Sequence, residues 1–354
     1  MISILEAITP SRIGGAEVYV AQICEKLPEL GARVELFCPA GRPFVDYAAN
    51  RGIQSINWKT HGKFDPITIL KLASLIKKNR IDVIHTHLST ASLLGAFAAK
   101  LAGVPSVAHV HGMNSVTCFK HSTLVIAVSE AVKRHLCSQG LDENKVRVVH
   151  NGIDLTRLQP TSAWDAKSNL GHDTQAPLFG VFGRLSHEKG QRTALEAFSI
   201  LHKDYPAAQL VLVGDGKDHD ELRSLANTLQ ISHNVHFAGF VPDPSHIMSA
   251  CNAVIVPSIK EGFGLSAVEA MALERPVVAT DAGGLPEIVI NGETGFIVPT
   301  HNPQAIADSL KHLLQDKSLA ESMGRRGRER VQDCFDLDKQ MMLLLSILQE
   351  AAGH

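Results

Sequence analysis

Short apolar runs alternate with longer amphipathic segments along nearly the whole chain. In the first half, the apolar runs predict strands at Ser3–Ile8, Arg33–Cys38, Ile81–His85, Ser106–Val110, Leu124–Val128 and Val146–Val149. Between these strands, apolar residues recur at helical spacing in segments such as Ala16–Leu30 and Ile67–Asn79. This alternation is typical of βαβ units and predicts a parallel sheet covered by helices.

The pattern is interrupted once and then resumes. Leu155–Pro177 is polar and has no strand-like run, so we interpret it as the linker between two domains. Later strands are predicted at Leu178–Phe182, Gln209–Val213, Val235–Phe237, Ala253–Val256, Val277–Ala279 and Gly295–Val298. Later helices are predicted at Gln191–Lys203, Leu265–Leu273, 302–315, 317–332 and 337–351. We therefore expect an α/β protein of two doubly wound domains facing a cleft, with the loops after the strands contacting the ligand.

The composition agrees with a globular protein. A length of 354 residues favours two domains, and 45% hydrophobic with 20% charged residues argue against disorder. The six cysteines form no C-x-x-C pair, so neither a zinc knuckle nor a disulfide framework is indicated. No signal-peptide pattern follows Met1, and no stretch approaches the roughly 20 apolar residues that a membrane-spanning helix needs. We therefore expect a cytoplasmic protein.

The net charge of -2 hides an asymmetry between the two halves. Residues 1–160 contain 18 Lys and Arg against 12 Asp and Glu, whereas residues 161–354 contain 16 against 24. A basic half favours an anionic membrane surface or a phosphorylated acceptor, although half-chains often differ by a few charges. One expectation is therefore peripheral contact with the inner face of the cytoplasmic membrane; we expect no nucleic-acid partner.

Histidines cluster at two expected strand ends. His85-Thr86-His87 closes one strand, and His109-Val110-His111-Gly112 closes another. Histidines so placed suggest a metal site first, but no carboxylate at ligand spacing accompanies them, so zinc is disfavoured. We select only His111 as a site residue, because the glycine after it allows a ligand to approach closely.

Two other motifs suggest anion binding. Gly14 and Gly15 follow the first strand and open the first helix, where the backbone can approach an anion. Arg184, after Gly183, directly follows another strand, and Lys189 precedes the next helix. Two fixed cations on one loop can neutralise a pyrophosphate. The alternative interpretations are a plain strand-to-helix turn and a surface charge pair.

The strongest local signal is Glu261–Leu265, with Glu269 on the helix that follows. The two glycines of this segment free the backbone to contact a ligand, and the helix beginning near Gly264 directs its free N–H groups to the same space. The carboxylate of Glu269 could accept two hydrogen bonds from a sugar diol. A glutamate near a helix start also simply stabilises the helix dipole, so that interpretation stays open.

In this order, the motifs resemble those of the family 4 glycosyltransferases, which have the GT-B fold of two Rossmann-like domains. The resemblance covers nearly the whole chain, and Glu261 and Glu269 match the family's E-x7-E pattern. The remaining matching motifs are Gly14–Glu17, His111-Gly112, Val128–Glu130, Asn151–Asp154, Gly183-Arg184, Lys189-Gly190, Val213–Gly216, Gly262–Gly264, Pro276–Thr280 and Gly283–Glu287. Because the family returns its last helix to the N-terminal domain, the resemblance implies one domain of residues 1–160 plus 338–354 and a second of residues 161–337.

The resemblance also implies roles for single residues. Arg184 and Lys189 would hold the diphosphate, Glu261 would contact the transferred sugar, and His111 would lie beside that sugar. Glu269 would bind the ribose hydroxyls. The expected donor-binding residues as a set are Gly14, Gly15, Gly183, Phe263, Gly264, Leu265 and Glu269.

Many sugar-nucleotide enzymes hold a metal with an Asp-x-Asp pair, and two such pairs occur here. Asp218-His219-Asp220 and Asp336-Leu337-Asp338 both lie at expected helix starts, where Asp is a common cap, and neither follows a strand end. We therefore assign no metal ligands.

The implied activity is transfer of a hexose or N-acetylhexosamine, with retention, from a nucleotide-diphosphate donor to a glycan or lipid-linked acceptor. UDP is the first choice of base by family frequency, GDP-mannose is the second, and the commonest setting is surface-polysaccharide or lipopolysaccharide biosynthesis. The donor is a substrate, and no cofactor is expected. Two alternatives stay open: a sugar-nucleotide epimerase of the same fold, and a non-catalytic sugar-nucleotide-binding subunit.

Overall fold

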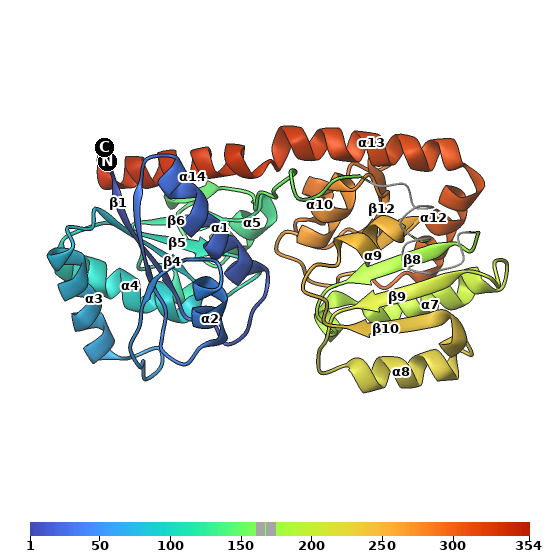
Figure 1. Cartoon of the computed structure of the whole chain (residues 1–354), viewed down its shortest axis with the longest axis horizontal. Coiled ribbons are helices and arrows are strands. Elements are labelled where there is room, and N and C mark those ends of the chain that lie inside the picture. The colour runs from blue at the N-terminus through green and yellow to red at the C-terminus, as the bar shows by residue number, and fades with distance from the viewer. Residues whose placement is uncertain (161–166, 168–174) are drawn as a thin grey trace. The chain divides into compact units, whose positions relative to one another are not determined.

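The computed structural model describes residues 1–160, 167 and 175–354. By their internal contacts these residues form two compact units, Met1–Gly152 with Leu337–His354, and Ile153–Asp336. Each unit is a parallel sheet with helices packed on it (Figure 1). The prediction of two doubly wound α/β domains is therefore confirmed for each unit taken by itself.

The first unit has a seven-stranded sheet in the order β3-β2-β1-β4-β5-β6-β7. Its strands are β1 (Ser3–Ile8), β2 (Arg33–Phe37), β3 (Ser55–Ile56), β4 (Val83–His87), β5 (Ser106–Val110), β6 (Leu124–Ala127) and β7 (Val146–Val148). Its helices are α1 (Gly15–Glu29), α2 (Pro43–Ala49), α3 (Pro66–Lys78), α4 (Ser89–Ala102), α5 (Glu130–Ser138) and α14 (Leu337–Ala352). The strand order reverses between β1 and β4, so their carboxyl ends border the switch point at which such sheets bind ligands.

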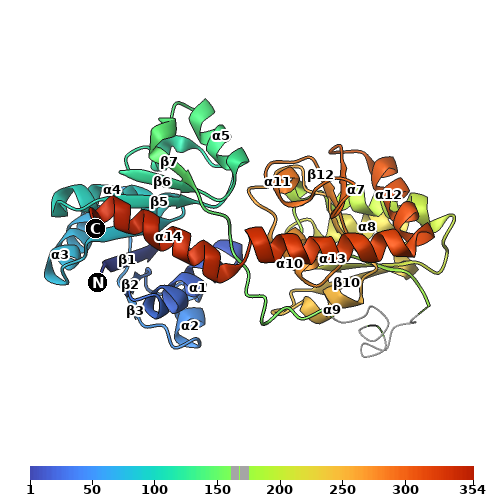
Figure 2. The ribbon, with the colours of Figure 1, turned by 90° about the horizontal axis from the view of Figure 1, so that it is seen from above.

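The two faces of this sheet are covered by different helices. Ile4 of β1 packs with Ile23 of α1 and Leu344 of α14, whereas its neighbour Leu5 packs with residues of α3 and α4, including Leu72. Figure 2 shows α14 running across the sheet. Because both faces are buried, the strands appear in the sequence as continuous apolar runs.

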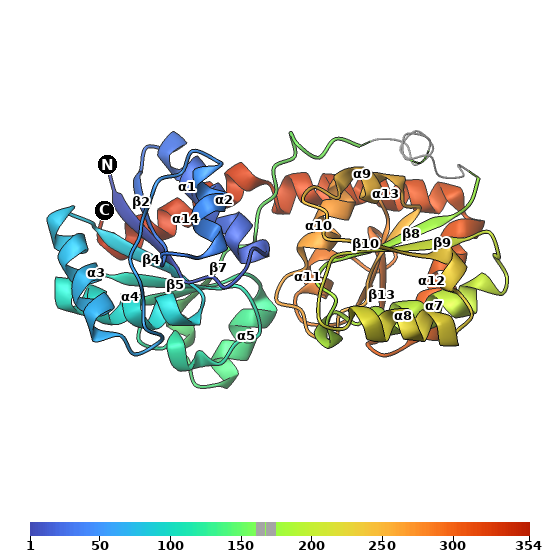
Figure 3. The ribbon, with the colours of Figure 1, turned by 60° about the horizontal axis from the view of Figure 1, so that its bottom comes forward.

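The second unit has a six-stranded sheet in the order β10-β9-β8-β11-β12-β13. Its strands are β8 (Leu178–Phe182), β9 (Gln209–Val213), β10 (Val235–Gly239), β11 (Ala253–Val256), β12 (Val277–Thr280) and β13 (Gly295–Val298). Its helices are α7 (Gln191–His202), α8 (His219–Thr228), α9 (Ser245–Ala250), α10 (Leu265–Ala272), α11 (Leu285–Ile288), α12 (Pro303–Gln315) and α13 (Lys317–Cys334) (Figure 3). Here the order reverses between β8 and β11, which places the second switch point between those two strands.

The boundary between the units differs from the expected one. We expected it after residue 160, but residues from Ile153 onward belong to the second unit. The reason is hydrogen bonding: the Ile153 N–H donates to Phe335 O at 2.9 Å, and Arg328 donates to Leu158 O at 2.9 Å. In the expected linker, Lys167 is buried and its ammonium donates to two oxygens of the second unit at 2.7 and 2.8 Å. Residues 161–166 and 168–174 of that linker lie outside the described residues.

Strand β3 was not predicted, because two half-buried residues leave no apolar run for the sequence to display. In the described part of the chain, no helix combines the length and the apolar character that crossing a membrane requires.

Candidate functional site

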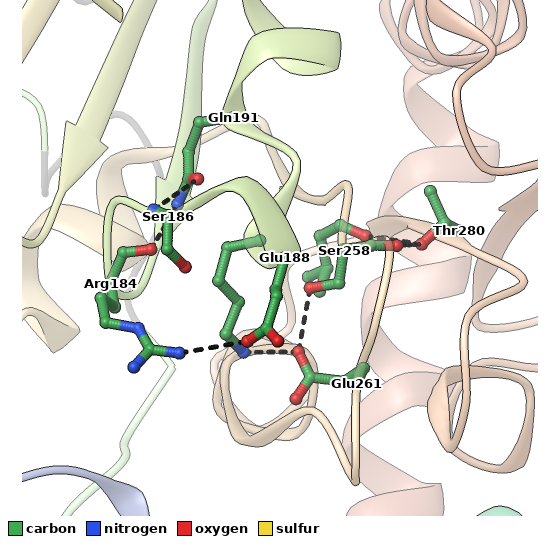
Figure 4. Close-up of polar contacts among 9 residues, drawn as sticks. Arg184, Ser186, Glu188, Gln191, Ser258, Glu261 and Thr280 are labelled. Atoms are coloured by element: carbon green, nitrogen blue, oxygen red, sulfur yellow. Dashed lines mark hydrogen bonds and ion pairs between the residues drawn. The ribbon is translucent and has the colours of Figure 1, made fainter. Parts of the chain in front are cut away.

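The loops on both sides of the second switch point carry the predicted charged residues. Arg184 and Lys189 lie on the loop between β8 and α7, and Glu261 lies on the loop between β11 and α10. These strands are neighbours in the sheet, so their loops start from adjacent positions on the same edge. Figure 4 shows Arg184 and Glu261 in this region.

An ion pair joins the two loops. Lys189 Nζ lies 2.6 Å from Glu261 Oε2, although the residues are 72 positions apart in the sequence. The Ser258 hydroxyl donates to the same carboxylate oxygen at 2.9 Å, and Thr280 donates to Ser258 O at 2.6 Å (Figure 4). Only 11% of the Glu261 side chain is exposed, so this carboxylate is held in place by two donors within a largely dry environment.

Arg184 is held through its backbone rather than its guanidinium. Gln191 donates to Arg184 O at 2.8 Å, whereas within the described ranges the guanidinium meets only the exposed Glu188, at 3.4 Å (Figure 4). Arg184 Nε is buried and has no hydrogen-bond partner among the residues described. The sequence suggested two fixed cations that could neutralise a pyrophosphate, with a surface charge pair as the alternative. The structure pairs each of them with a carboxylate.

Glycines allow the loops of this site to pack backbone against backbone. A Cβ on Gly190 would lie 1.9 Å from Pro257 O, and a Cβ on Gly214 would lie 2.0 Å from Gly183 O. Gly190 has φ +67 and Gly214 has φ +138, conformations that side chains of L residues rarely adopt. The glycines therefore bring together the loops after β8, β9 and β11.

Helix α10 starts at the same edge. Gly264, with φ +119, precedes Leu265, the first helical residue, and Glu269 follows one turn later and is half-buried. Burial, with a smaller contribution from Asp243, raises the pKa of the Glu269 carboxyl to about 7. Phe263 is only 2% exposed and packs edge-on against another aromatic ring, so its side chain belongs to the core and only its backbone is available to a ligand.

The glycines at the first switch point already have an acidic neighbour. Gly14 precedes α1, and Gly15 is its first residue. The carboxylate of the buried Glu17 lies so close that a Cβ on Gly14 would be 3.3 Å from its Oε2. Burial raises the pKa of Glu17, and hydrogen bonds from backbone N–H groups of Glu17 and Gly14 partly oppose this. An incoming phosphate would therefore compete with Glu17, a role that the sequence did not suggest.

The four histidines at the strand ends, of which only His111 was predicted as a site residue, form one cluster with a carboxylate that we had not expected. Glu6 Oε1 lies 2.9 Å from His85 Nδ1, and Glu6 Oε2 lies 2.8 Å from His87 Nε2. Glu6 is 79 residues from His85 in the sequence, but parallel pairing of β1 with β4 places the two residues opposite each other. The premise that no carboxylate accompanies these histidines was therefore wrong.

The outer histidines complete the cluster. His109 Nδ1 lies 3.3 Å from His85 Nε2, and His111 Nε2 lies 3.0 Å from His87 Nδ1. His85, His87 and His109 are close enough together to be considered as metal ligands. Burial is the main cause that lowers the pKa of His87 and of His109 well below the ordinary value and that of His111 to about 3.

The two Asp-x-Asp pairs lie where the sequence placed them, at helix starts. Asp218 immediately precedes α8, Asp220 lies in its first turn, and Asp336 immediately precedes α14.

Comparison with known proteins agrees with this architecture. HepE of Anabaena, in its crystal structure with UDP, superposes with a TM-score of 0.89 at 25% identity, covering 99% of this chain and 100% of HepE. A second structure of HepE, with UDP-glucose, gives a TM-score of 0.87 at 26% identity, and the superposition covers 98% of this chain and 100% of HepE. The fold and the charged switch point thus define a glycosyltransferase of the GT-B class.

The sequence comparisons narrow this class. The profile described as Glycosyltransferase Family 4 matches residues 13–157, and that described as Glycosyl transferases group 1 matches residues 162–330. The D-inositol 3-phosphate glycosyltransferase of Corynebacterium jeikeium is 30% identical, with 88% of this chain and 86% of the relative covered. The UDP-Gal:alpha-D-GlcNAc-diphosphoundecaprenol alpha-1,3-galactosyltransferase of Escherichia coli is 26% identical, with 93% of this chain and 92% of that relative covered. The chain belongs to glycosyltransferase family 4.

We expect Gly190→Ala to disrupt the site more than a glycine substitution elsewhere, because the new methyl group would meet Pro257 O. Gly292→Ala is the matched control: its φ is +79, but nothing lies within 4 Å of the added Cβ. Strain alone should cost each variant about 1 kcal/mol. The clash should add about 1–3 kcal/mol for Gly190→Ala. Urea denaturation measures both, and equal losses of stability would contradict the close packing of these loops.

Proposed function

We propose that this protein transfers a hexose or N-acetylhexosamine from a UDP-sugar to a glycan or lipid-linked acceptor with retention of configuration. The observation that carries the proposal is the Lys189–Glu261 ion pair beside Arg184 at the second switch point. This arrangement presents cations and a fixed carboxylate at one edge of a sheet, as a diphosphate joined to a sugar requires. The UDP and UDP-glucose in the crystals of HepE, and the UDP-Gal named for the Escherichia coli relative, support UDP as the base.

The roles follow from the chemistry of each side chain. Arg184 has an unpartnered buried Nε, and Lys189 can exchange its carboxylate partner for a phosphate oxygen. Glu261, still held by the Ser258 hydroxyl, would accept hydrogen bonds from hydroxyl groups of the transferred sugar. Glu269, as a carboxylate, would accept hydrogen bonds from the two ribose hydroxyl groups. The backbone N–H groups at the start of α10 would add donors to the phosphate.

The reaction needs no nucleophile from the enzyme. The bond between the anomeric carbon and the diphosphate breaks while the acceptor oxygen bonds to the same face of the sugar. A phosphate oxygen of the donor takes the acceptor proton, and the nucleoside diphosphate leaves. The protein contributes positioning, together with donors already oriented toward the departing charge. Arg184, Lys189 and the start of α10 would supply this stabilisation in place of a metal ion.

A lipid-linked acceptor would bring the protein to a membrane, and one surface of the first unit suits that contact. Five large apolar side chains on α3, on α4 and just before α3 are exposed, and we call this set the α3–α4 face: Phe64 (84%), Ile67 (59%), Leu70 (63%), Phe97 (40%) and Leu101 (53%). The exposed lysines on the same helices are Lys71, Lys77, Lys78 and Lys100. Apolar side chains flanked by lysines favour the interface of an anionic bilayer.

The first test removes single cations and metal ions. Arg184→Ala and Lys189→Ala should each lower turnover by about a hundred- to a thousandfold, since each removes a donor to the departing diphosphate. Arg192→Ala, which removes an exposed arginine paired with Glu221, should have little effect. UDP release from UDP-sugars is measured with a panel of polyprenyl-diphosphate-linked sugars, and products are analysed for transfer, epimerisation or neither.

Wild-type turnover should survive excess EDTA. If EDTA abolishes it and magnesium or manganese restores it, metal-independent transfer is wrong, and Asp218 and Asp220 return as candidate ligands. An epimerised donor without transfer would favour the epimerase alternative, and binding without any turnover would favour a binding subunit.

Donor affinity should depend on pH through Glu269. Ribose hydroxyls donate hydrogen bonds to the ionised carboxylate of Glu269. Because the pKa of Glu269 in the ligand-free protein is about 7, donor affinity should be full above pH 8 and should fall as the pH drops through 7. Calorimetry with UDP-glucose avoids the terminal phosphate of UDP, which titrates near the same pH. Glu269→Gln should bind about 2–3 kcal/mol more weakly and without this pH dependence. An unchanged profile in the folded variant would remove Glu269 from the site.

Binding to vesicles tests the α3–α4 face. The wild-type protein should float with vesicles of phosphatidylcholine and phosphatidylserine, and less at high salt, because each lysine near the surface contributes about 1 kcal/mol. Ile67→Ser with Leu70→Ser should abolish flotation, whereas Phe240→Ser, at a side chain 69% exposed in the second unit, should not. Equal binding to vesicles of phosphatidylcholine alone, or no binding to either, would contradict membrane contact by this face.

A further inference from the structure

Five buried or half-buried side chains at the first switch point form one unbranched chain of contacts. Glu6 lies at its centre, and each of its carboxylate oxygens meets one histidine, His85 or His87. Each of these inner histidines meets one outer histidine through its second ring nitrogen: His85 meets His109, and His87 meets His111. The cluster therefore has two arms of equal length that share one carboxylate.

Counting protons assigns every tautomer in these arms. A carboxylate only accepts, so His85 Nδ1 and His87 Nε2 must both carry hydrogens. A neutral imidazole has a single N–H, so the other nitrogen of each inner histidine is an acceptor. His109 Nδ1 and His111 Nε2 must then donate. The remaining nitrogens, His109 Nε2 and His111 Nδ1, are left with bare lone pairs.

Two further observations are consistent with this count. The rings must be neutral for it to hold, and burial, together with the neighbouring histidines, lowers the pKa of His87, His109 and His111. His109 Nε2 and His111 Nδ1 are also the two histidine nitrogens of the cluster that are buried without a partner in the described part of the chain.

We propose that Glu6, acting through His87, holds His111 in the Nε2–H tautomer, so that its Nδ1 accepts a hydrogen bond from a hydroxyl group of the sugar substrate. Glu6 and His87 are positioning residues in this scheme, and only His111 touches the ligand. Only the assignment of the hydroxyl group to a sugar rests on the proposed function. We call the series of contacts from Glu6 through His87 to His111 the relay. A bare lone pair on His111 Nδ1 can accept a hydrogen bond from a hydroxyl group but cannot donate one to a phosphate or carbonyl oxygen, so the relay determines which ligand group fits.

In the same count, the inner histidines have no lone pair left over for a metal ion. The inner nitrogens that face away from Glu6 already accept hydrogen bonds from the outer histidines. An ion at this position would have to displace those protons. The buried ring of Tyr19 packs edge-on against His109 and His111, at centroid distances of 5.4 and 6.0 Å, and this packing helps to exclude water, which strengthens the hydrogen bonds.

The tautomer can be observed directly in the ligand-free, full-length protein. Long-range proton–nitrogen NMR correlations of ¹⁵N-histidine-labelled protein distinguish protonated from bare ring nitrogens, and His111→Gln identifies the signals of His111. We expect a protonated Nε2 and a bare Nδ1 on His111 across the neutral pH range. A protonated Nδ1, or a mixture of both tautomers, overturns the proposal, as does a stoichiometric amount of zinc in the purified protein.

Variants of the two arms separate the relay from general packing. His87→Leu removes the acceptor for His111 Nε2 and should give a mixture of tautomers, whereas His87→Asn keeps an acceptor near the position of Nδ1 and should retain the single tautomer. His85→Leu, in the other arm, should leave the tautomer of His111 unchanged. Equal effects of His85→Leu and His87→Leu would overturn the relay. If the leucine variants fail to fold, the wild-type spectrum still decides.

Titration with UDP-glucose tests the ligand group. The Nδ1 signal of His111 should shift when UDP-glucose binds and shift much less with UDP alone. Binding of UDP-glucose that leaves this signal unmoved overturns the assignment of the hydroxyl group. If His111 has the expected tautomer but the protein transfers no sugar, the relay is supported and the proposed function is refuted. The two failures are therefore distinguishable.

Discussion

Each sheet reverses its strand order once, and this single constraint decides where polar side chains can gather. In a parallel sheet all carboxyl ends lie at one edge, and at the reversal the two neighbouring loops leave toward opposite faces. In the first unit that place lies between β1 and β4, where Glu6 meets His85 and His87. In the second unit it lies between β8 and β11, where Lys189 meets Glu261.

The two sites satisfy their buried polar groups in different ways. In the first, each oxygen of the buried Glu6 carboxylate accepts a hydrogen bond from one imidazole, so protein donors take the place of water around it. In the second, the charges of Lys189 and Glu261 are paired directly and remain partly exposed. A buried hydrogen-bonded network suits the orientation of a ligand hydroxyl, whereas an accessible ion pair can open to admit a charged diphosphate.

Much of the architecture was predictable from the sequence because both faces of each sheet are buried. Continuous apolar runs predicted the bounds of β1, β5, β8, β9, β11 and β13 as the structure has them. Local motifs likewise placed Arg184, Lys189 and Glu261 on loops after strands. By contrast, the two-residue β3 and the short α2 display too little periodicity to be recognised. The domain boundary lies at Ile153 rather than after residue 160, because residues from Ile153 onward hydrogen-bond to the second unit.

The amino-acid sequence by itself determined the alternation of strands and helices, the family, and the residue types available after each strand. Only the tertiary structure decided which of them meet. Parallel pairing placed Glu6 beside His85 across 79 residues, and adjacent loops joined Lys189 to Glu261 across 72. No local pattern encodes such pairs, because side chains so far apart become neighbours only through the order and register of the strands that carry them.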